Sequence, residues 1–117
     1  MGSCKMSDIE KKVLNDYVSA IGSNKLQNLW QDFLKDTASF LKKVSFENKQ
    51  ALRLKFHNLR SDAQVFGMKN FSIGCAEIET AILEDEKEDV LLSKIKKIKQ
   101  IFEEQSKQVN AYFEEIQ

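Results

Sequence analysis

The chain has 117 residues, of which 42% are hydrophobic and 31% charged, so it can bury the core of one domain but not of two. Its 18 basic and 18 acidic residues balance to a formal net charge of +0, and both signs are mixed along the chain, which argues against nucleic acid as the main partner. No run of about 18 apolar residues is present, so the sequence predicts no membrane-spanning helix.

The two cysteines, Cys4 and Cys75, are too few for the disulfide framework of a small secreted domain. They are also not clustered with other ligand residues, so we expect no bound metal. A reducing, cytoplasmic setting fits this cysteine usage best. We expect residues 1–6 to form a disordered leader and residues 7–117 to form a single helical domain.

The sequence contains no proline and only four glycines, and it has no strand signals, so we predict an all-α fold. Ser7 and Glu10 are expected to form a capping box at the first helix, and Gly22 to end it. Ser45 is expected to cap the third helix. The expected helices cover residues 7–21, 23–44, 46–67, 70–83 and 90–115.

Apolar residues recur at spacings of three and four in each predicted helix, which is typical of helices with one buried face. Leu29 in the second helix and Leu92 in the last are among the residues expected to face inward. Short links between four long amphipathic helices predict an antiparallel up-down four-helix bundle. The short N-terminal helix is expected to lie across one end of it.

His57 is the only histidine of the chain and lies in the predicted third helix. At about 100° per residue, it is roughly 140° away from the apolar stripe of that helix. It therefore points towards water, and its flank carries positive charge and small or polar side chains. The stripe consists of Leu52, Phe56, Leu59, Ala63 and Phe66, and the flank of Arg53, Arg60, Ser61 and Gln64.

Glu79 in the fourth helix is predicted to lie at the level of His57. Both residues are eleven positions from residue 68, near which the two helices turn, and antiparallel helices with equal rise bring such positions together. A carboxylate beside an imidazole can hold the Nδ1 proton and leave the Nε2 lone pair free. The pattern therefore predicts an activated histidine nucleophile.

The residues from His57 to Glu79 form a spaced motif: His57, Leu59, Arg60, Ser61, Gly67, Cys75, Ile78 and Glu79. This motif resembles the centre of a histidine-containing phosphotransfer (HPt) domain. That family has His, any residue, Leu, Lys and Gly, a further Gly ten residues after the His, and then Cys, two residues, an apolar residue and Glu or Gln. The similarity covers about residues 52–82, and the overall length suits a stand-alone member.

The resemblance implies a phosphorelay intermediate. His57 would accept a phosphoryl group on Nε2 from a phospho-aspartate of one receiver domain and pass it to another, without ATP. Arg60 would replace the lysine that neutralises the phosphate, and Glu79 would hydrogen-bond the other ring nitrogen. The resemblance and the flank of the helix place four further residues in the neighbourhood of the phosphate or the partner: Ser61, Gln64, Arg53 and Gly67.

The partners implied are response-regulator receiver domains and a hybrid sensor histidine kinase. The resemblance implies no cofactor in this chain, since Mg²⁺ would belong to the receiver. We expect a monomer in the cytoplasm, or also in the nucleus in a eukaryotic relay, with no nucleic acid or membrane partner. The partner is expected to cover the His57 face and the adjoining sides of the first and second helices.

Two residues depart from the family pattern. Ser61 stands where a glycine leaves room for the receiver, and Asp62 adds negative charge beside it. Both keep an alternative open, namely a non-catalytic adaptor that binds receivers (a pseudo-HPt domain) or another helical interaction module. A sensor-kinase dimerisation helix fits less well because Ser61 and Asp62 replace its Thr-Pro. A di-metal carboxylate bundle would need two histidines.

Overall fold

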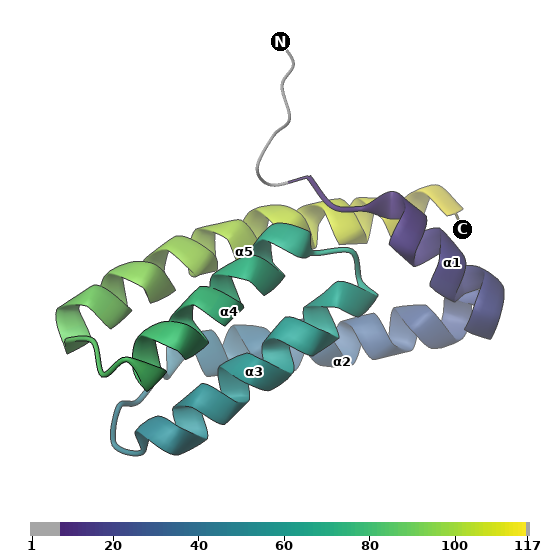
Figure 1. Cartoon of the computed structure of the whole chain (residues 1–117). Helices are drawn as coiled ribbons and strands as arrows, with labels where there is room; N and C mark the ends of the chain where they lie inside the picture. Colours follow the sequence, from purple (N-terminus) through teal and green to yellow (C-terminus); the bar gives the residue numbers. More distant parts are fainter. Residues whose placement is uncertain (1–7, 117) are drawn as a thin grey trace, which may run out of the picture.

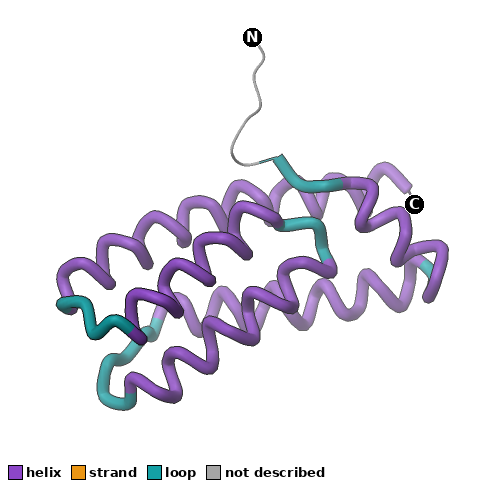
Figure 2. The backbone as a smooth tube through the Cα atoms, in the orientation of Figure 1, coloured by secondary structure: helices purple, strands orange, loops and turns teal. Residues whose placement is uncertain are grey.

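Five α-helices make up most of residues 8–116, the part of the chain that this computed structural model describes, and no strand occurs among these residues (Figure 2). The prediction of an all-helical chain is confirmed. The predicted leader, residues 1–6, lies outside the described residues. The helices are α1 Lys11–Ile21, α2 Ser23–Lys42, α3 Lys49–Val65, α4 Lys69–Leu83 and α5 Glu88–Ile116.

The beginnings of two helices differ from those predicted. α1 begins at Lys11, after Glu10, whose side chain makes no capping hydrogen bond, and Ser7 of the predicted capping box lies outside the described residues. α3 is capped by Asn48, whose Oδ1 accepts from the Ala51 amide at 3.0 Å. Ser45 was therefore the wrong cap. Its Oγ accepts from the amide of Glu47, two residues on, and forms a turn in the preceding loop.

The four longer helices run along the length of the molecule, and α1 lies at one end, between the end of α5 and the beginning of α2 (Figure 1). α4 packs between α3 and α5, and α2 contacts α5. Within residues 8–116, no helix is long and apolar enough to cross a membrane.

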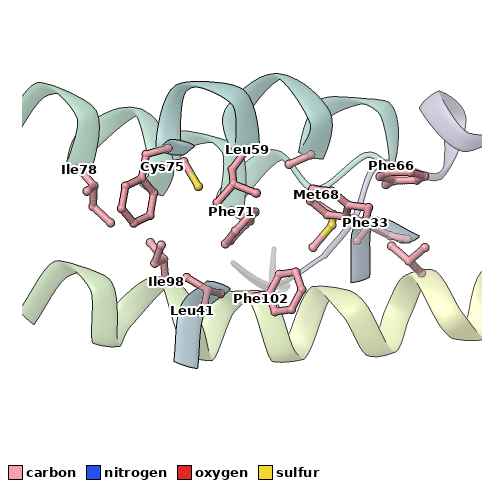
Figure 3. Packing of buried hydrophobic residues seen from close by; sticks show 14 of the residues in the cluster. Phe33, Leu41, Leu59, Phe66, Met68, Phe71, Cys75, Ile78, Ile98 and Phe102 are labelled. Atoms are coloured by element: carbon pink, nitrogen blue, oxygen red, sulfur yellow. The ribbon is translucent and has the colours of Figure 1, made fainter. Parts of the chain in front are cut away.

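The core is one continuous apolar cluster to which every helix contributes. Aromatic rings pack together within it: Phe66 contacts Trp30 and Phe33, with ring centroids 5.1 and 5.2 Å apart. Figure 3 shows Phe33 and Phe66 among the buried side chains of this cluster. Two predicted inward residues are exposed instead: Leu29 is 46% exposed and Leu92 is 52% exposed. Leu29 borders a hollow between α2 and α3, so its side chain is not closed off by the facing helix.

The α3–α4 turn is fixed against the segment before α1. Gly67 has φ +70°, and its carbonyl accepts from the Glu10 amide at 2.8 Å. A Cβ at this position would lie 2.5 Å from the Glu10 carbonyl oxygen. Only glycine therefore combines this left-handed conformation with so close a backbone approach.

Candidate functional site

His57 lies in the middle of α3, directly after the fully buried Phe56. The core contact of Phe56 fixes the rotation of the helix, so the next side chain is directed outward. The His57 side chain is 42% exposed, as the hydrophobic periodicity predicts. An imidazole in this position can meet a second protein without any opening of the fold.

Glu79 reaches the same imidazole from α4. Its Oε2 and Oε1 lie 3.1 and 3.3 Å from His57 Nδ1, so the predicted proximity of the two residues is confirmed. The Glu79 side chain is only 13% exposed, and it follows Ile78, which is fully buried. The carboxylate is therefore held at the α3–α4 seam and faces one ring nitrogen.

Arg53 lies one turn before His57 on α3 and binds the same carboxylate. Its Nη1 donates to Glu79 Oε2 at 3.2 Å, and its side chain is 32% exposed. An ion pair that is partly open to water contributes less than about 1 kcal/mol to stability. Its effect is chiefly on geometry, because it holds the Glu79 oxygen that is nearer to His57. The sequence analysis had placed Arg53 in the neighbourhood of the phosphate without this partner.

Arg60 lies one turn after His57, and its Nη2 is 3.3 Å from the same Nδ1. The guanidinium is therefore beside the nitrogen that Glu79 also contacts. A carboxylate only accepts hydrogen bonds and a guanidinium only donates them, so the two groups require opposite protonation states of Nδ1. This competition could not be predicted from the spacing of the residues.

Ser61 and Gln64 border a groove between α1, α3 and α4 that begins one turn beyond His57 and has a volume of about 590 Å³. Val13 and Tyr17 of α1 form part of its opposite wall. Gln64 is tied across the hairpin, where its Nε2 donates to Ser72 Oγ at 3.3 Å. Its amide is thus engaged by α4 and held beside the groove.

Ser72 was not predicted as part of this region. Its hydroxyl is buried and donates to the Arg60 carbonyl at 2.9 Å, while accepting from Gln64. It links α4 to the α3 turn that carries Arg60. A serine within an apolar helical stripe is the only sequence signal that could have indicated this contact.

Asp62 and Gly67 lie apart from the imidazole. Asp62 borders a separate hollow of about 340 Å³ between α2 and α3, on the other side of α3 from the groove that Ser61 borders. Gly67 is buried at the turn under Glu10, about 15 Å along the chain from His57 at 1.5 Å per residue. Gly67 therefore shapes the hairpin and is not part of the surface beside the ring.

Cys75 of the spaced motif is a core residue, as expected. It is fully buried in the central cluster (Figure 3), and burial raises the pKa of its thiol by penalising the thiolate. The side chain packs as a small apolar group.

Leu54 is an exposed apolar side chain that the sequence analysis did not single out. It is 52% exposed and precedes His57 by three residues, so the two lie on neighbouring parts of one helix face. Together with Tyr17, which is 38% exposed at the groove, it gives the surface around the ring an apolar component. Such a surface suits contact with another protein better than with a small ion.

Comparisons with protein-family models, with curated proteins and with solved structures gave no significant match. The site is therefore described by its own geometry. No group of three or more His, Cys, Asp or Glu side chains within residues 8–116 is arranged to hold a metal ion.

Proposed function

We propose that this protein is a phosphorelay intermediate that accepts a phosphoryl group on His57 from a receiver-domain phospho-aspartate and passes it to another receiver. Its fold in this proposal is an HPt-like antiparallel up-down four-helix bundle with the short α1 at one end. The observation that carries the proposal is the exposed His57 ring whose Nδ1 faces Glu79 at 3.1 Å. In this proposal Nε2, the ring nitrogen that does not face Glu79, is the one that reacts.

The transfer step needs little from this chain. The Nε2 lone pair attacks the phosphorus in line, the bond from phosphorus to the aspartate oxygen breaks, and its electron pair stays on the receiver's carboxylate. The ring becomes an Nε2-phosphorylated imidazolium that keeps its Nδ1 proton, which donates to Glu79. Transfer to the next receiver is the reverse of this step. Charge neutralisation by Mg²⁺ belongs to the receiver.

Arg60 supplies the positive charge on this side of the reaction. Its Nη2 lies 3.3 Å from His57 Nδ1, so the half-buried guanidinium is beside the ring that would carry the phosphoryl group. A guanidinium pairs well with phosphate oxygens because its donors form a planar fork. Arg60 can thus replace the lysine of the family pattern.

The surface around the ring supports a protein partner. Leu54 lies before His57 on α3, and the groove that Ser61 borders lies after it, with Tyr17 on the α1 side. Ile9, in the segment before α1, is buried and does not contribute to this surface. We place the receiver over the α3 face and the α1 side of this groove, with this protein a cytoplasmic monomer.

Transfer from a phosphorylated receiver tests the proposal. The wild-type protein is incubated with a panel of phosphorylated receiver domains, and the product is treated with acid and with alkali. We expect phosphate that survives alkali, is lost in acid and is absent from the His57→Gln variant. Asn58 is the next residue and is exposed, so Asn58→Gln is the matched control and retains transfer.

The adaptor is the second candidate, and the exposed Ser61 at the mouth of the groove favours it because its side chain narrows the space that a glycine leaves. Binding and transfer separate the two functions. An adaptor binds receivers equally well as wild type and as His57→Gln and receives no phosphate from any of them. A relay loses transfer in His57→Gln. In the chain that keeps His57, it transfers phosphate faster when Ser61 is replaced by Gly.

A further inference from the structure

We propose that Arg53 is a positioning residue that sets the tautomer of His57, and that it does so by holding Glu79 against Nδ1 in competition with Arg60. This inference rests on the proposed function, whose nucleophile it concerns. It assigns to Arg53 a role that is separate from contact with the phosphate or the partner.

Nδ1 of His57 has two neighbours, of which one can only accept a hydrogen bond and the other can only donate one. Glu79 lies 3.1 Å away and can only accept, so its hydrogen bond requires a proton on Nδ1. Arg60 lies 3.3 Å away and can only donate, so its hydrogen bond requires a bare Nδ1. In a neutral ring the two hydrogen bonds exclude each other, and each selects one tautomer.

The two tautomers differ in reactivity. With the proton on Nδ1, the Nε2 lone pair is free and can attack phosphorus. With Arg60 bonded to Nδ1, the proton is on Nε2 and no lone pair faces the partner. The balance between Glu79 and Arg60 at one atom therefore decides whether His57 is a nucleophile.

Arg53 favours the reactive tautomer. Its Nη1 donates to Glu79 Oε2 at 3.2 Å, and the same oxygen is the closer of the two to Nδ1. The pair is partly shielded from water, since the Glu79 side chain is 13% exposed. Without Arg53, Glu79 would have no cation of its own, and its carboxylate would be free to turn towards water or towards Arg60.

The incoming phosphoryl group acts on the same balance. Its negative charge attracts Arg60, the cation next to the ring that is not engaged by Glu79. As Arg60 leaves Nδ1, the tautomer with the proton on Nδ1, where it donates to Glu79, becomes favoured. The Nε2 lone pair is then free. Arrival of the phosphoryl group and activation of its acceptor are thereby coupled.

Nitrogen NMR of the ring tests this inference on the full chain. His57 is the only histidine, so ¹⁵N-histidine labelling gives one Nδ1 and one Nε2 signal, whose shifts report the tautomer ratio. Spectra are recorded at a pH where titration shows the ring to be neutral. We expect Arg53→Gln to move the ratio towards Nε2–H by about two- to fivefold, the range of a partly exposed ion pair.

The opposing residue gives a change of opposite sign. Arg60→Gln moves the ratio towards Nδ1–H, Arg53→Lys restores most of the wild-type ratio, and Lys55→Gln is the matched control. Lys55 is on the same helix, but its ammonium lies over the Phe40 ring, so its loss leaves the ratio unchanged. Circular dichroism checks that each variant folds.

An unchanged ratio in folded Arg53→Gln, or a shift of Arg60→Gln towards Nε2–H, would overturn the inference. The NMR readout needs no phosphate and no partner. Failure of the proposed function would appear as absent transfer in a protein whose tautomer still responds to both arginines. Failure of this inference alone would appear as normal transfer together with a tautomer ratio that does not change when Arg53 or Arg60 is replaced.

Discussion

The imidazole of His57 contacts a carboxylate from α4 and one arginine of its own helix, and a second arginine of that helix binds the carboxylate. The three shortest contacts measure 3.1, 3.2 and 3.3 Å. Each distance is that of a hydrogen bond in a partly exposed position, so the set contributes little to stability and much to orientation. In the proposed relay, the reactivity of His57 depends on which of these partners holds Nδ1, and Arg60 is the cation that would meet the phosphoryl group.

Replacing Arg60 with Gln is expected to slow transfer about tenfold. Loss of a hydrogen bond to a charged group costs about 1.5–3 kcal/mol, or roughly 10- to 100-fold in rate. The gain in the reactive tautomer is at most about fivefold, so the loss of charge is the larger effect. Single-turnover transfer from a phosphorylated receiver measures it. Arg60→Lys should remain within about threefold of wild type, and an equal rate in Arg60→Gln would contradict this role.

At the scale of elements, helix periodicity predicts the site well and helix boundaries less well. The pairing of His57 with Glu79 was predicted from their equal number of residues to the α3–α4 turn, which requires only equal rise in two antiparallel helices. The two side chains do lie within hydrogen-bond distance. The cap of α3 is different, because Ser45 and Asn48 are equally good capping residues and only the loop path decides between them. Periodicity cannot supply that path.

Asn48→Ala is expected to lower the free energy of unfolding by about 1 kcal/mol. The substitution removes the Oδ1 acceptor of the Ala51 amide and leaves one first-turn donor of α3 to water. Urea denaturation followed by circular dichroism measures the change. Ser45→Ala is the matched control and should stay within about 0.5 kcal/mol of wild type. A larger loss in Ser45→Ala than in Asn48→Ala would mean that α3 begins at the predicted serine.

Gly67→Ala is expected to lower the free energy of unfolding by about 2–3 kcal/mol. The left-handed conformation costs an alanine about 1–2 kcal/mol, and displacement of Glu10 loses a further hydrogen bond of about 1 kcal/mol. Urea denaturation measures this loss as well. The exposed Ser93→Ala on α5 is the control and should have a small effect. Equal stability of the two variants would contradict the tight contact with Glu10.

At the scale of the whole molecule, the helices are joined by polar contacts that no local pattern indicates. Gln105 of α5 is fully buried, with its Oε1 accepting from the Phe71 amide at 3.0 Å and its Nε2 donating to the Asp8 carbonyl at 3.3 Å. Trp30 Nε1 donates to Asn110 Oδ1 at 2.8 Å and ties α2 to α5. These three contacts join residues that are 34, 97 and 80 positions apart in the sequence.

This difference explains what could be predicted from the sequence. The all-helical fold follows from the lack of proline and of strand signals, whereas the outward histidine and the Glu79 contact follow from periodicity within one hairpin. The pairing of Arg53 with Glu79 and the position of Arg60 beside Nδ1 do not, because they depend on rotamers chosen among several neighbours. Exposure at Leu29 was missed because burial is decided by which helix lies opposite.

Gln105→Leu is expected to lower the free energy of unfolding by about 1–3 kcal/mol, the cost of leaving a buried amide without an acceptor. The volume is nearly preserved, so the loss reports the hydrogen bonds more than packing. Gln100→Leu, exposed on the same helix, is the control and should be near neutral in urea denaturation. A Gln105→Leu variant as stable as wild type would show that the Phe71 amide needs no side-chain partner.

The central claim is that His57 Nε2 carries a phosphoryl group taken from a receiver. The most direct measurement is phosphorus and nitrogen NMR of ¹⁵N-histidine-labelled protein after incubation with a phosphorylated receiver. We predict one new phosphorus signal coupled to His57 Nε2, with Nδ1 protonated beside Glu79. Phosphorus on any other residue, or receivers that bind the protein but lose their phosphate only as inorganic phosphate, would contradict it.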